Sequence, residues 1–199
     1  MAKAMQDENI VKPDAENLAA AAKAASKKGQ PPVHLWNPPF CGDLDMQIKR
    51  DGTWFYLGTP IGRFGLVKLF SSILRKDGDD YFLVTPVEKV GITVEDAPFV
   101  AIDFDVEHPG PEQRITFHTQ VEDTVVASSD KPIRVVRDPE TGEPSPYILV
   151  RANLEALIDR KSFYRLVDIG EHRDHNGDRW FGVRSAGAFF PIIPSKELE

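Results

Sequence analysis

Two runs of alternating residues flank Asp51-Gly52 and form the most distinct local pattern of the chain. An Asp-Gly pair between such runs favours a β-hairpin closed by a two-residue type I′ turn. Pairing across this turn joins Arg50 to Thr53 and directs one set of apolar side chains to the core, namely Met46, Ile48, Phe55 and Leu57. Trp54 and Tyr56 then lie on the opposite face, where either a second layer covers them or they form a stacking platform.

An amphipathic helix is predicted directly after this hairpin. Apolar residues recur there at the spacing i, i+3, i+4 and i+7, namely Leu66, Leu69, Phe70 and Ile73. Arg75 and Lys76 would occupy its last turn, where a positive charge suits the helix dipole. Two strands are expected next, at 81–86 and 91–96.

Beyond residue 99 the hydrophobic period changes to two. Apolar and acidic residues alternate in 100–107, which predicts one apolar face made of Val100, Ile102, Phe104 and Val106. Residues 115–121 show the same alternation, so we expect the two segments to form an antiparallel hairpin with one solvent-facing side. Further predicted elements are strands at 124–127, 133–137 and 147–151, a helix at 153–161, a strand at 164–169, a turn at Asn176-Gly177 and a strand at 180–185.

These elements predict an α+β fold of two β-rich lobes, each with antiparallel strands and a packed helix. We expect a mobile N-terminal segment at 1–33 with a marginal Ala-rich helix, an N-terminal lobe at 34–99 and a C-terminal lobe at 100–199. Both lobes share the order strand, turn, strand, helix, strand, which indicates either an internal duplication or two uses of a common unit. A duplicated chain would offer the cleft between its lobes as the natural ligand site.

Composition and charge narrow the classes of function. The net charge of −7 over 199 residues argues against a general nucleic-acid binder, which needs a basic surface. A single cysteine, Cys41, excludes an intramolecular disulfide and a multi-cysteine zinc site. No apolar run is long enough to span a bilayer, and the first residues lack the apolar core of a signal peptide. We therefore expect a cytoplasmic protein without membrane insertion.

Several short motifs invite a chemical interpretation. Residues 58–63, GTPIGR, lie between a strand and a helix, where Arg63 and backbone N–H groups could hold an anion. They lack the Lys-Ser/Thr of a phosphate-binding loop, so an ordinary connecting turn is the simpler interpretation. His172 and His175 lie among carboxylates, but this segment resembles an exposed hairpin tip more than a metal site. Ser185 lacks the context of a nucleophile, and we predict no catalytic residue, metal or cofactor.

The sequence favours a ligand-binding module whose site lies in the cleft between the lobes. Trp54 and Tyr56 would stack on a ring, while Arg63 and Arg151 would hold an anionic group. The other cleft candidates are Glu88, Lys89, Arg160 and Arg184.

Two alternatives remain open at this point. The chain could be a protein-interaction module that docks a partner through exposed sheet surface or the Ala-rich helix. It could also be a carboxylate-dependent hydrolase, if Glu88 and Asp96 prove convergent, buried and raised in pKa.

Five motifs together resemble a bacterial family known as domain of unknown function 1285. They are IKRDGTWFYLGTPIGR from Ile48 to Arg63, LVKLFSSILR, YFLVTPVEK, VEDAPF and YILVRANLEALIDR, and the resemblance extends from Trp36 to Pro191. The resemblance implies a two-lobed α+β structure with a duplicated core and a second lobe similar to pleckstrin-homology-like domains. It also implies a nucleotide-like ligand between the lobes and a role in signal transduction, with no established activity.

Overall fold

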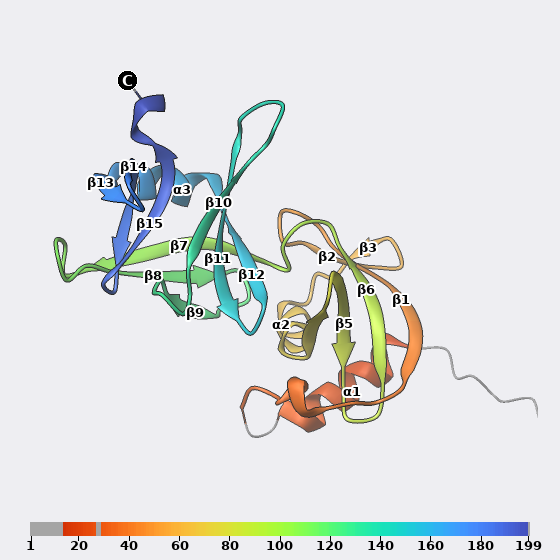
Figure 1. Ribbon diagram of the computed structural model, residues 1–199. Coiled ribbons are helices and arrows are strands. Elements are labelled where there is room, and N and C mark those ends of the chain that lie inside the picture. The colour runs from red at the N-terminus through yellow and green to blue at the C-terminus, as the bar shows by residue number, and fades with distance from the viewer. Residues whose placement is uncertain (1–13, 27–28, 199) are drawn as a thin grey trace, which may run out of the picture. The chain divides into compact units, whose positions relative to one another are not determined.

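The computed structural model describes residues 14–26 and 29–198, which form an α+β fold with two larger sheets and one smaller sheet (Figure 1). The chain divides into two compact units. The first combines residues 1–46 with 65–93, and the second combines 47–64 with 94–199. The predicted α+β class with two β-rich lobes is confirmed.

The first sheet has the strand order β3-β2-β1-β6-β5-β4. Its strands are β1 (Phe40–Ile48), β2 (Trp54–Tyr56), β3 (Thr59–Pro60), β4 (Leu74–Asp77), β5 (Asp80–Val84) and β6 (Lys89–Val94). The strands predicted at 81–86 and 91–96 correspond to β5 and β6.

Helix α1 (Ala15–Ala25) confirms the predicted Ala-rich helix, and it is anchored in the first unit. Asp14 caps its first turn by accepting a hydrogen bond from the Glu16 N–H at 3.3 Å. Leu18 and Ala22 are buried on one helical face. Residues 1–13 and 27–28 of the predicted mobile segment lie outside the described residues. A short 3₁₀ turn, η2 (Val33–Leu35), follows.

Helix α2 (Phe64–Ser72) confirms the predicted amphipathic helix but ends earlier than expected. Ile73 leaves the helix because its carbonyl accepts a hydrogen bond from the Val84 N–H at 2.9 Å. Arg75 and Lys76 therefore lie on β4, where the last helical turn was predicted.

The hairpin between β1 and β2 has a register one residue away from the predicted one. The Lys49 N–H donates to the Thr53 carbonyl at 2.9 Å, and the Gly52 N–H donates back to the Lys49 carbonyl at 2.9 Å. With φ of +84° at Gly52, this is the three-residue hairpin loop that ends in a left-handed glycine. The predicted pairing of Arg50 with Thr53 is therefore wrong.

A one-residue shift of register exchanges the two faces of a strand. Trp54 accordingly lies in the core with 1% of its surface exposed, beside the fully buried Ile48. Leu57, expected in the core, is 64% exposed. Leu57 and Gly58 both have positive φ, 49° and 74°, and form the two-residue turn between β2 and β3. The type I′ geometry expected at Asp51-Gly52 thus occurs one turn later.

The second sheet has the order β10-β11-β12-β7-β8-β9. Its strands are β7 (Phe99–Glu107), β8 (Arg114–Thr119), β9 (Thr124–Val126), β10 (Ile133–Arg137), β11 (Pro144–Arg151) and β12 (Leu154–Ile158). Neighbouring strands of this sheet run antiparallel, except that β12 and β7 pair in parallel.

A β-bulge modifies the predicted alternation of β7. The register with β8 passes from Ala101 opposite Thr119 to Asp103 opposite His118, which leaves Ile102 as the extra residue. Ile102 is 44% exposed, although the strict period of two placed it on the core face. Phe104 keeps its predicted burial.

The predicted helix at 153–161 is wrong, and so is the predicted strand at 164–169. Residues 154–158 alternate between buried and half-buried and form β12, whereas α3 (Arg160–Asp168) begins only after Asp159. The Asp159 carboxylate caps this helix by accepting a hydrogen bond from the Ser162 N–H at 2.7 Å. The element order that suggested an internal duplication is therefore shifted, and the duplication stays a prediction, as does the pleckstrin-homology-like character.

The smaller sheet consists of β13 (Glu171–His175), β14 (Asp178–Ser185) and β15 (Ala188–Pro194), followed by the 3₁₀ turn η3 (Ser195–Glu197). The predicted turn at Asn176-Gly177 joins β13 to β14. Fully buried Ser185 links this sheet to the second one, since its hydroxyl donates to the Ala127 carbonyl at 2.7 Å and accepts from the Ile115 N–H at 2.9 Å. Among the described residues, no helix is long and apolar enough to cross a membrane.

Candidate functional site

Trp54 is not available as a stacking surface. Its side chain is 1% exposed and lies in the core, not on the opposite face where a second layer or a ligand was expected to cover it. Tyr56 is half-buried, and Arg63 is exposed just before α2 with no ion-pair partner among the described residues. All three belong to the second unit.

Glu88 and Lys89 belong to the first unit. The Lys89 ammonium is held by the Asp77 carboxylate at 2.7 Å and lies 3.9 Å from the centre of the Phe82 ring. The charge of Lys89 is therefore compensated within its own unit. For Glu88, burial raises the pKa above its usual value, and the nearby Asp14 carboxylate makes a further contribution.

Two of the predicted anion-binding arginines are already paired with carboxylates. Arg151 lies 2.6 Å from Asp123 and over the Phe99 ring, and burial lowers its pKa. Arg184 donates to the Glu171 carboxylate through Nη2 at 2.6 Å. Both guanidinium groups therefore stabilise the second unit through ion pairs with carboxylates of that unit.

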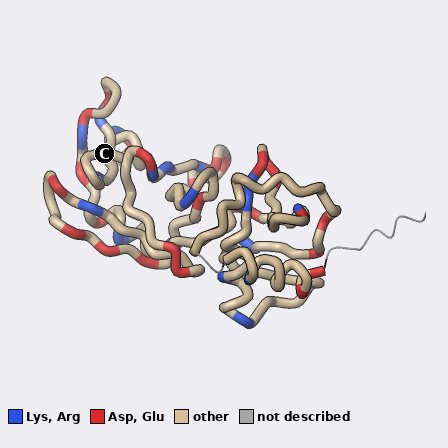
Figure 2. The backbone as a smooth tube through the Cα atoms, turned by 90° about the horizontal axis from the view of Figure 1, so that it is seen from below, with Lys and Arg blue, Asp and Glu red and all other residues tan. Residues whose placement is uncertain are grey.

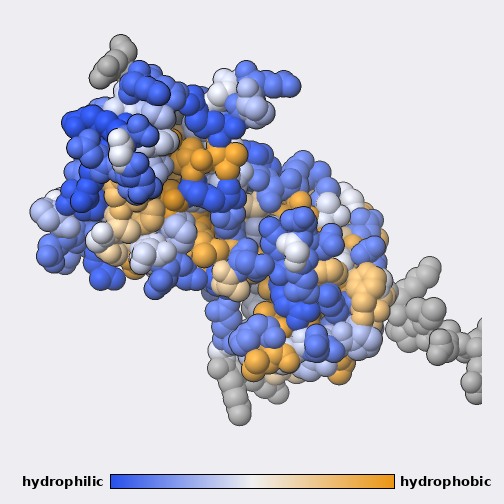
Figure 3. Space-filling view, viewed as in Figure 1, coloured by the Kyte–Doolittle hydropathy of each residue, from blue (hydrophilic) through white to orange (hydrophobic). Residues whose placement is uncertain are grey.

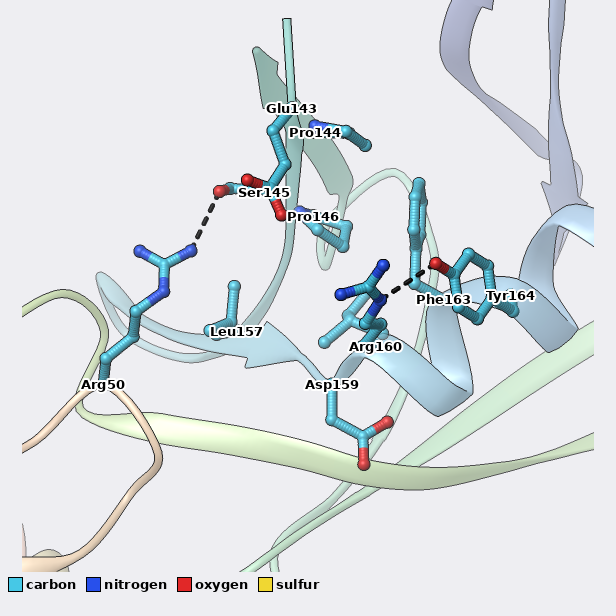
Figure 4. Close-up of a pocket in the computed structure, with 11 residues that line it drawn as sticks. Arg50, Glu143, Pro144, Ser145, Pro146, Leu157, Asp159, Arg160, Phe163 and Tyr164 are labelled. Carbon is cyan, nitrogen blue, oxygen red and sulfur yellow. Dashed lines mark hydrogen bonds between the residues drawn. The ribbon is translucent and has the colours of Figure 1, made fainter. Parts of the chain in front are cut away.

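A cavity that combines polar and aromatic groups lies in the second unit, between β11 and the start of α3 (Figure 4). Its volume is about 340 Å³. We call it the Arg160 pocket, and its principal walls are Pro144, Ser145, Pro146, Arg160, Phe163 and Tyr164, with Arg50 at one edge. Figure 4 shows the Arg160 guanidinium near Pro146 and Phe163, while the Asp159 carboxylate points the other way.

Arg160 has no carboxylate within ion-pair distance among the residues that the structure describes. Its Nε donates a hydrogen bond to the Tyr164 hydroxyl at 2.9 Å, one helical turn away. This contact and the attraction of Glu143 raise the pKa of Arg160 further, so its charge is permanent. By contrast, the ion-paired arginines of the second unit are Arg50, Arg134, Arg137, Arg151, Arg165, Arg179 and Arg184.

Arg50 closes the other edge of the pocket from the hairpin loop. Its Nη2 donates to the Ser145 hydroxyl at 3.0 Å, and its Nη1 lies 2.6 Å from the Asp96 carboxylate. Asp96 also accepts a hydrogen bond from the Tyr147 hydroxyl at 2.8 Å, and burial followed by this contact raises the pKa of Tyr147. Arg50 thus has a structural role, and the Asp96 carboxylate is held by both Arg50 and Tyr147.

Only Arg160 among the predicted site residues lines this pocket. Sequence reasoning missed Arg50, Ser145, Phe163 and Tyr164. One signal was available, because Arg160 and Tyr164 are four residues apart and meet on a helix that begins at Asp159. The predicted helix at 153–161 ended before Tyr164 and hid that pairing.

Both histidines of the β13–β14 hairpin contact other side chains of the second unit. His172 Nδ1 lies 2.8 Å from the Ser195 hydroxyl, and His175 packs against the Phe189 ring. No group of three or more possible metal ligands occurs within 14–26 and 29–198. Acidic and basic residues are interspersed along the backbone, in keeping with the many ion pairs (Figure 2).

Most of the chain is similar to known proteins. The model of the family "Domain of unknown function (DUF1285), N-terminal domain" matches residues 31–97, and "Protein of unknown function (DUF1285), C-terminal domain" matches 98–192. No curated protein matches the chain.

Two crystal structures of DUF1285 family proteins are similar to it. The protein from Silicibacter pomeroyi DSS-3 is 60% identical with a TM-score of 0.83, over 91% of this chain and 97% of that one. The protein from Shewanella baltica OS155 is 29% identical with a TM-score of 0.50, over 63% of this chain and 92% of that one. The resemblance inferred from the motifs is confirmed, and the chain belongs to the DUF1285 family.

Proposed function

We propose that this protein is a binding module for a small organic anion and that the Arg160 pocket is its site. One observation carries the proposal: Arg160 is a permanent cation without a carboxylate partner among the described residues, and it lines a cavity of about 340 Å³. A cavity of this size suits a small ligand, and the pocket combines apolar walls with few polar groups.

The surroundings of Arg160 favour an anion that carries a ring or another flat apolar group. Phe163 and Tyr164 present aromatic surface, and Pro144 and Pro146 present apolar surface on the facing strand. Arg160 retains both Nη groups for a carboxylate or phosphate, since only its Nε is used by Tyr164. Nucleotide-like compounds combine these features and are the first to test.

The carboxylates at the pocket limit the charge of a suitable ligand. Glu143 lines the cavity and attracts Arg160, whereas Asp159 is occupied as the cap of α3. A ligand with several negative charges would be repelled by Glu143, so singly or doubly charged anions are expected to bind better than triphosphates. Binding of such a ligand would suit a signalling role in the cytoplasm, which the family resemblance implied.

Thermal unfolding in the presence of mononucleotides and dinucleotides tests the proposal. A ligand at a hundred times its Kd stabilises the folded state by about 2.7 kcal/mol, which is a readily measured shift in Tm. Arg160→Ala should abolish that shift. The matched control is Arg114→Ala, because Arg114 is exposed on β8 and also lacks an ion-pair partner among the described residues, but lies outside the pocket.

Two results would refute the proposal. The first is that no compound at millimolar concentration raises the Tm of the unmodified chain. The second is that Arg160→Ala and Arg114→Ala respond to the same compound as the unmodified chain does. The cleft between the lobes and a protein partner remain predictions that this experiment does not require.

A further inference from the structure

An apolar groove adjoins the Arg160 pocket. It has a volume of about 260 Å³, and its apolar walls are Pro144, Phe163, Val167, Phe181, Ile192 and Ile193. Pro144 and Phe163 line both cavities, so the groove and the pocket share a wall. Figure 3 shows hydrophobic surface among hydrophilic surface in the part of the second unit where Figure 1 places β10 and β15.

One face of α3 runs from the pocket into the groove. Arg160, Phe163 and Val167 follow the spacing i, i+3 and i+7, which places their side chains in one stripe along the helix. Arg160 lines the pocket, Val167 lines the groove, and Phe163 lines both. The stripe therefore starts with a guanidinium and continues with apolar side chains.

The cation that lines the groove itself is already compensated. Arg137 forms an ion pair with Glu197 of η3 and also donates through Nε to the Gly142 carbonyl. Arg160 has no such carboxylate partner among the described residues. The two cavities together thus present a cation without an ion pair among the described residues at the N-terminal end of α3, and an apolar surface farther along it.

The geometry points to an amphiphilic anion as the ligand, with its charged group at Arg160 and an unbranched aliphatic chain lying along Phe163 and Val167 in the groove. This inference rests on the proposed function, because it takes Arg160 as the contact of the anionic group. Each methylene that moves from water into an apolar groove strengthens binding by roughly fourfold. Affinity should therefore rise with chain length until the groove is filled.

Titration calorimetry with straight-chain carboxylates from butanoate to decanoate tests this, with adenosine monophosphate as an anion that lacks a chain. For the unmodified protein we expect affinity to increase about tenfold or more for every two added methylenes. Val167→Phe fills the groove and should remove most of that increase while leaving the binding of adenosine monophosphate unchanged. Its matched control is Val136→Phe, because Val136 is exposed on β10 and lines neither cavity.

Arg160→Ala separates this inference from the proposed function. It should weaken the binding of carboxylates of every chain length by a similar factor, whereas Arg137→Ala should not weaken their binding. Binding of adenosine monophosphate that depends on Arg160 but no gain with chain length overturns the amphiphile and leaves the proposed function intact. The amphiphile is likewise overturned if Val167→Phe and Val136→Phe behave alike. If binding depends on chain length but is abolished by Arg137→Ala and spared by Arg160→Ala, the charged group does not lie at Arg160 and the assigned direction is overturned. If neither the carboxylates nor adenosine monophosphate bind, both the amphiphile and the proposed function are overturned.

Discussion

Replacing Gly52 by alanine tests the register of the β1–β2 hairpin. Gly52 has φ of +84°, and a Cβ added there would lie 2.9 Å from Gln120 Nε2 and 3.0 Å from Val100 Cγ2. Gln120 cannot move away freely. The side-chain Oε1 of Gln120 accepts a hydrogen bond from the Val100 N–H at 2.7 Å, and the backbone N–H of Gln120 donates to the Val100 carbonyl at 2.9 Å. The substitution therefore combines backbone strain with a close contact.

Two glycines of the same segment separate these contributions. Gly58 has φ of +74° with nothing within 4 Å of an added Cβ, so Gly58→Ala should cost about 1–2 kcal/mol through backbone strain alone. Gly62 is equally open and has no positive φ, so Gly62→Ala should be neutral or stabilise by up to about 1 kcal/mol. Gly52→Ala adds overpacking of about 1–3 kcal/mol to the strain. Its total destabilisation should reach about 2–5 kcal/mol.

Urea unfolding followed by tryptophan fluorescence measures all three variants. The midpoint should fall most for Gly52→Ala, less for Gly58→Ala and not at all for Gly62→Ala, with an unchanged dependence on urea. If Gly52→Ala destabilises no more than Gly58→Ala, Gly52 does not approach Gln120 and Val100. The three-residue loop would then be incorrect, and the two-residue turn with Arg50 paired to Thr53 would regain support.

Three further predictions address other parts of the chain. In a variant that keeps Trp54 alone, with Trp36→Phe and Trp180→Phe, fluorescence should be blue-shifted and protected from acrylamide; easy quenching would contradict the burial of Trp54. Ser185→Ala leaves a buried N–H and a buried carbonyl unpaired and should lower the unfolding free energy in urea by about 2–4 kcal/mol. Because folding raises the pKa of Glu88, protonation of Glu88 stabilises the folded state. This stabilisation is fully present below the ordinary pKa of 4.5 and is lost as the pH rises through the pKa of the folded state. Glu88→Gln should therefore raise Tm at pH 7 and lose this advantage at pH 4.

The fold was largely readable from the sequence where hydrophobic period and turn chemistry agreed. The Ala-rich helix after Asp14, the helix α2 and the strands β7 and β8 all follow from such agreement. Errors arose where two patterns competed over a few residues. In 154–158 the period of two governs a buried strand, although Leu154 and Ile158 also have the i, i+4 spacing of a helix.

The candidate site was less predictable because it depends on which residue begins α3. With a helix start at Asn153, Arg160 would stand near a helix end and Tyr164 would lie on a strand. With Asp159 as the cap, the same residues stand on consecutive turns and form one wall of a pocket. Local sequence could not decide between the two capping residues, since both Asn and Asp are favourable caps. Burial of Leu154 and Ile158 in the second sheet decides it.

The hairpin shows how a shift of one residue changes the location of a site. A two-residue turn would place Arg50 in the strand ladder and direct Trp54 outward as a ligand platform. The three-residue loop instead buries Trp54 and leaves Arg50 in the loop, where its side chain can bind Asp96 and Ser145. Because Ser145 of β11 lines the Arg160 pocket and accepts a hydrogen bond from Arg50, the loop becomes part of the pocket wall. The hairpin therefore still contributes to the candidate site, through the arginine of its loop and not through the aromatic face of its strand.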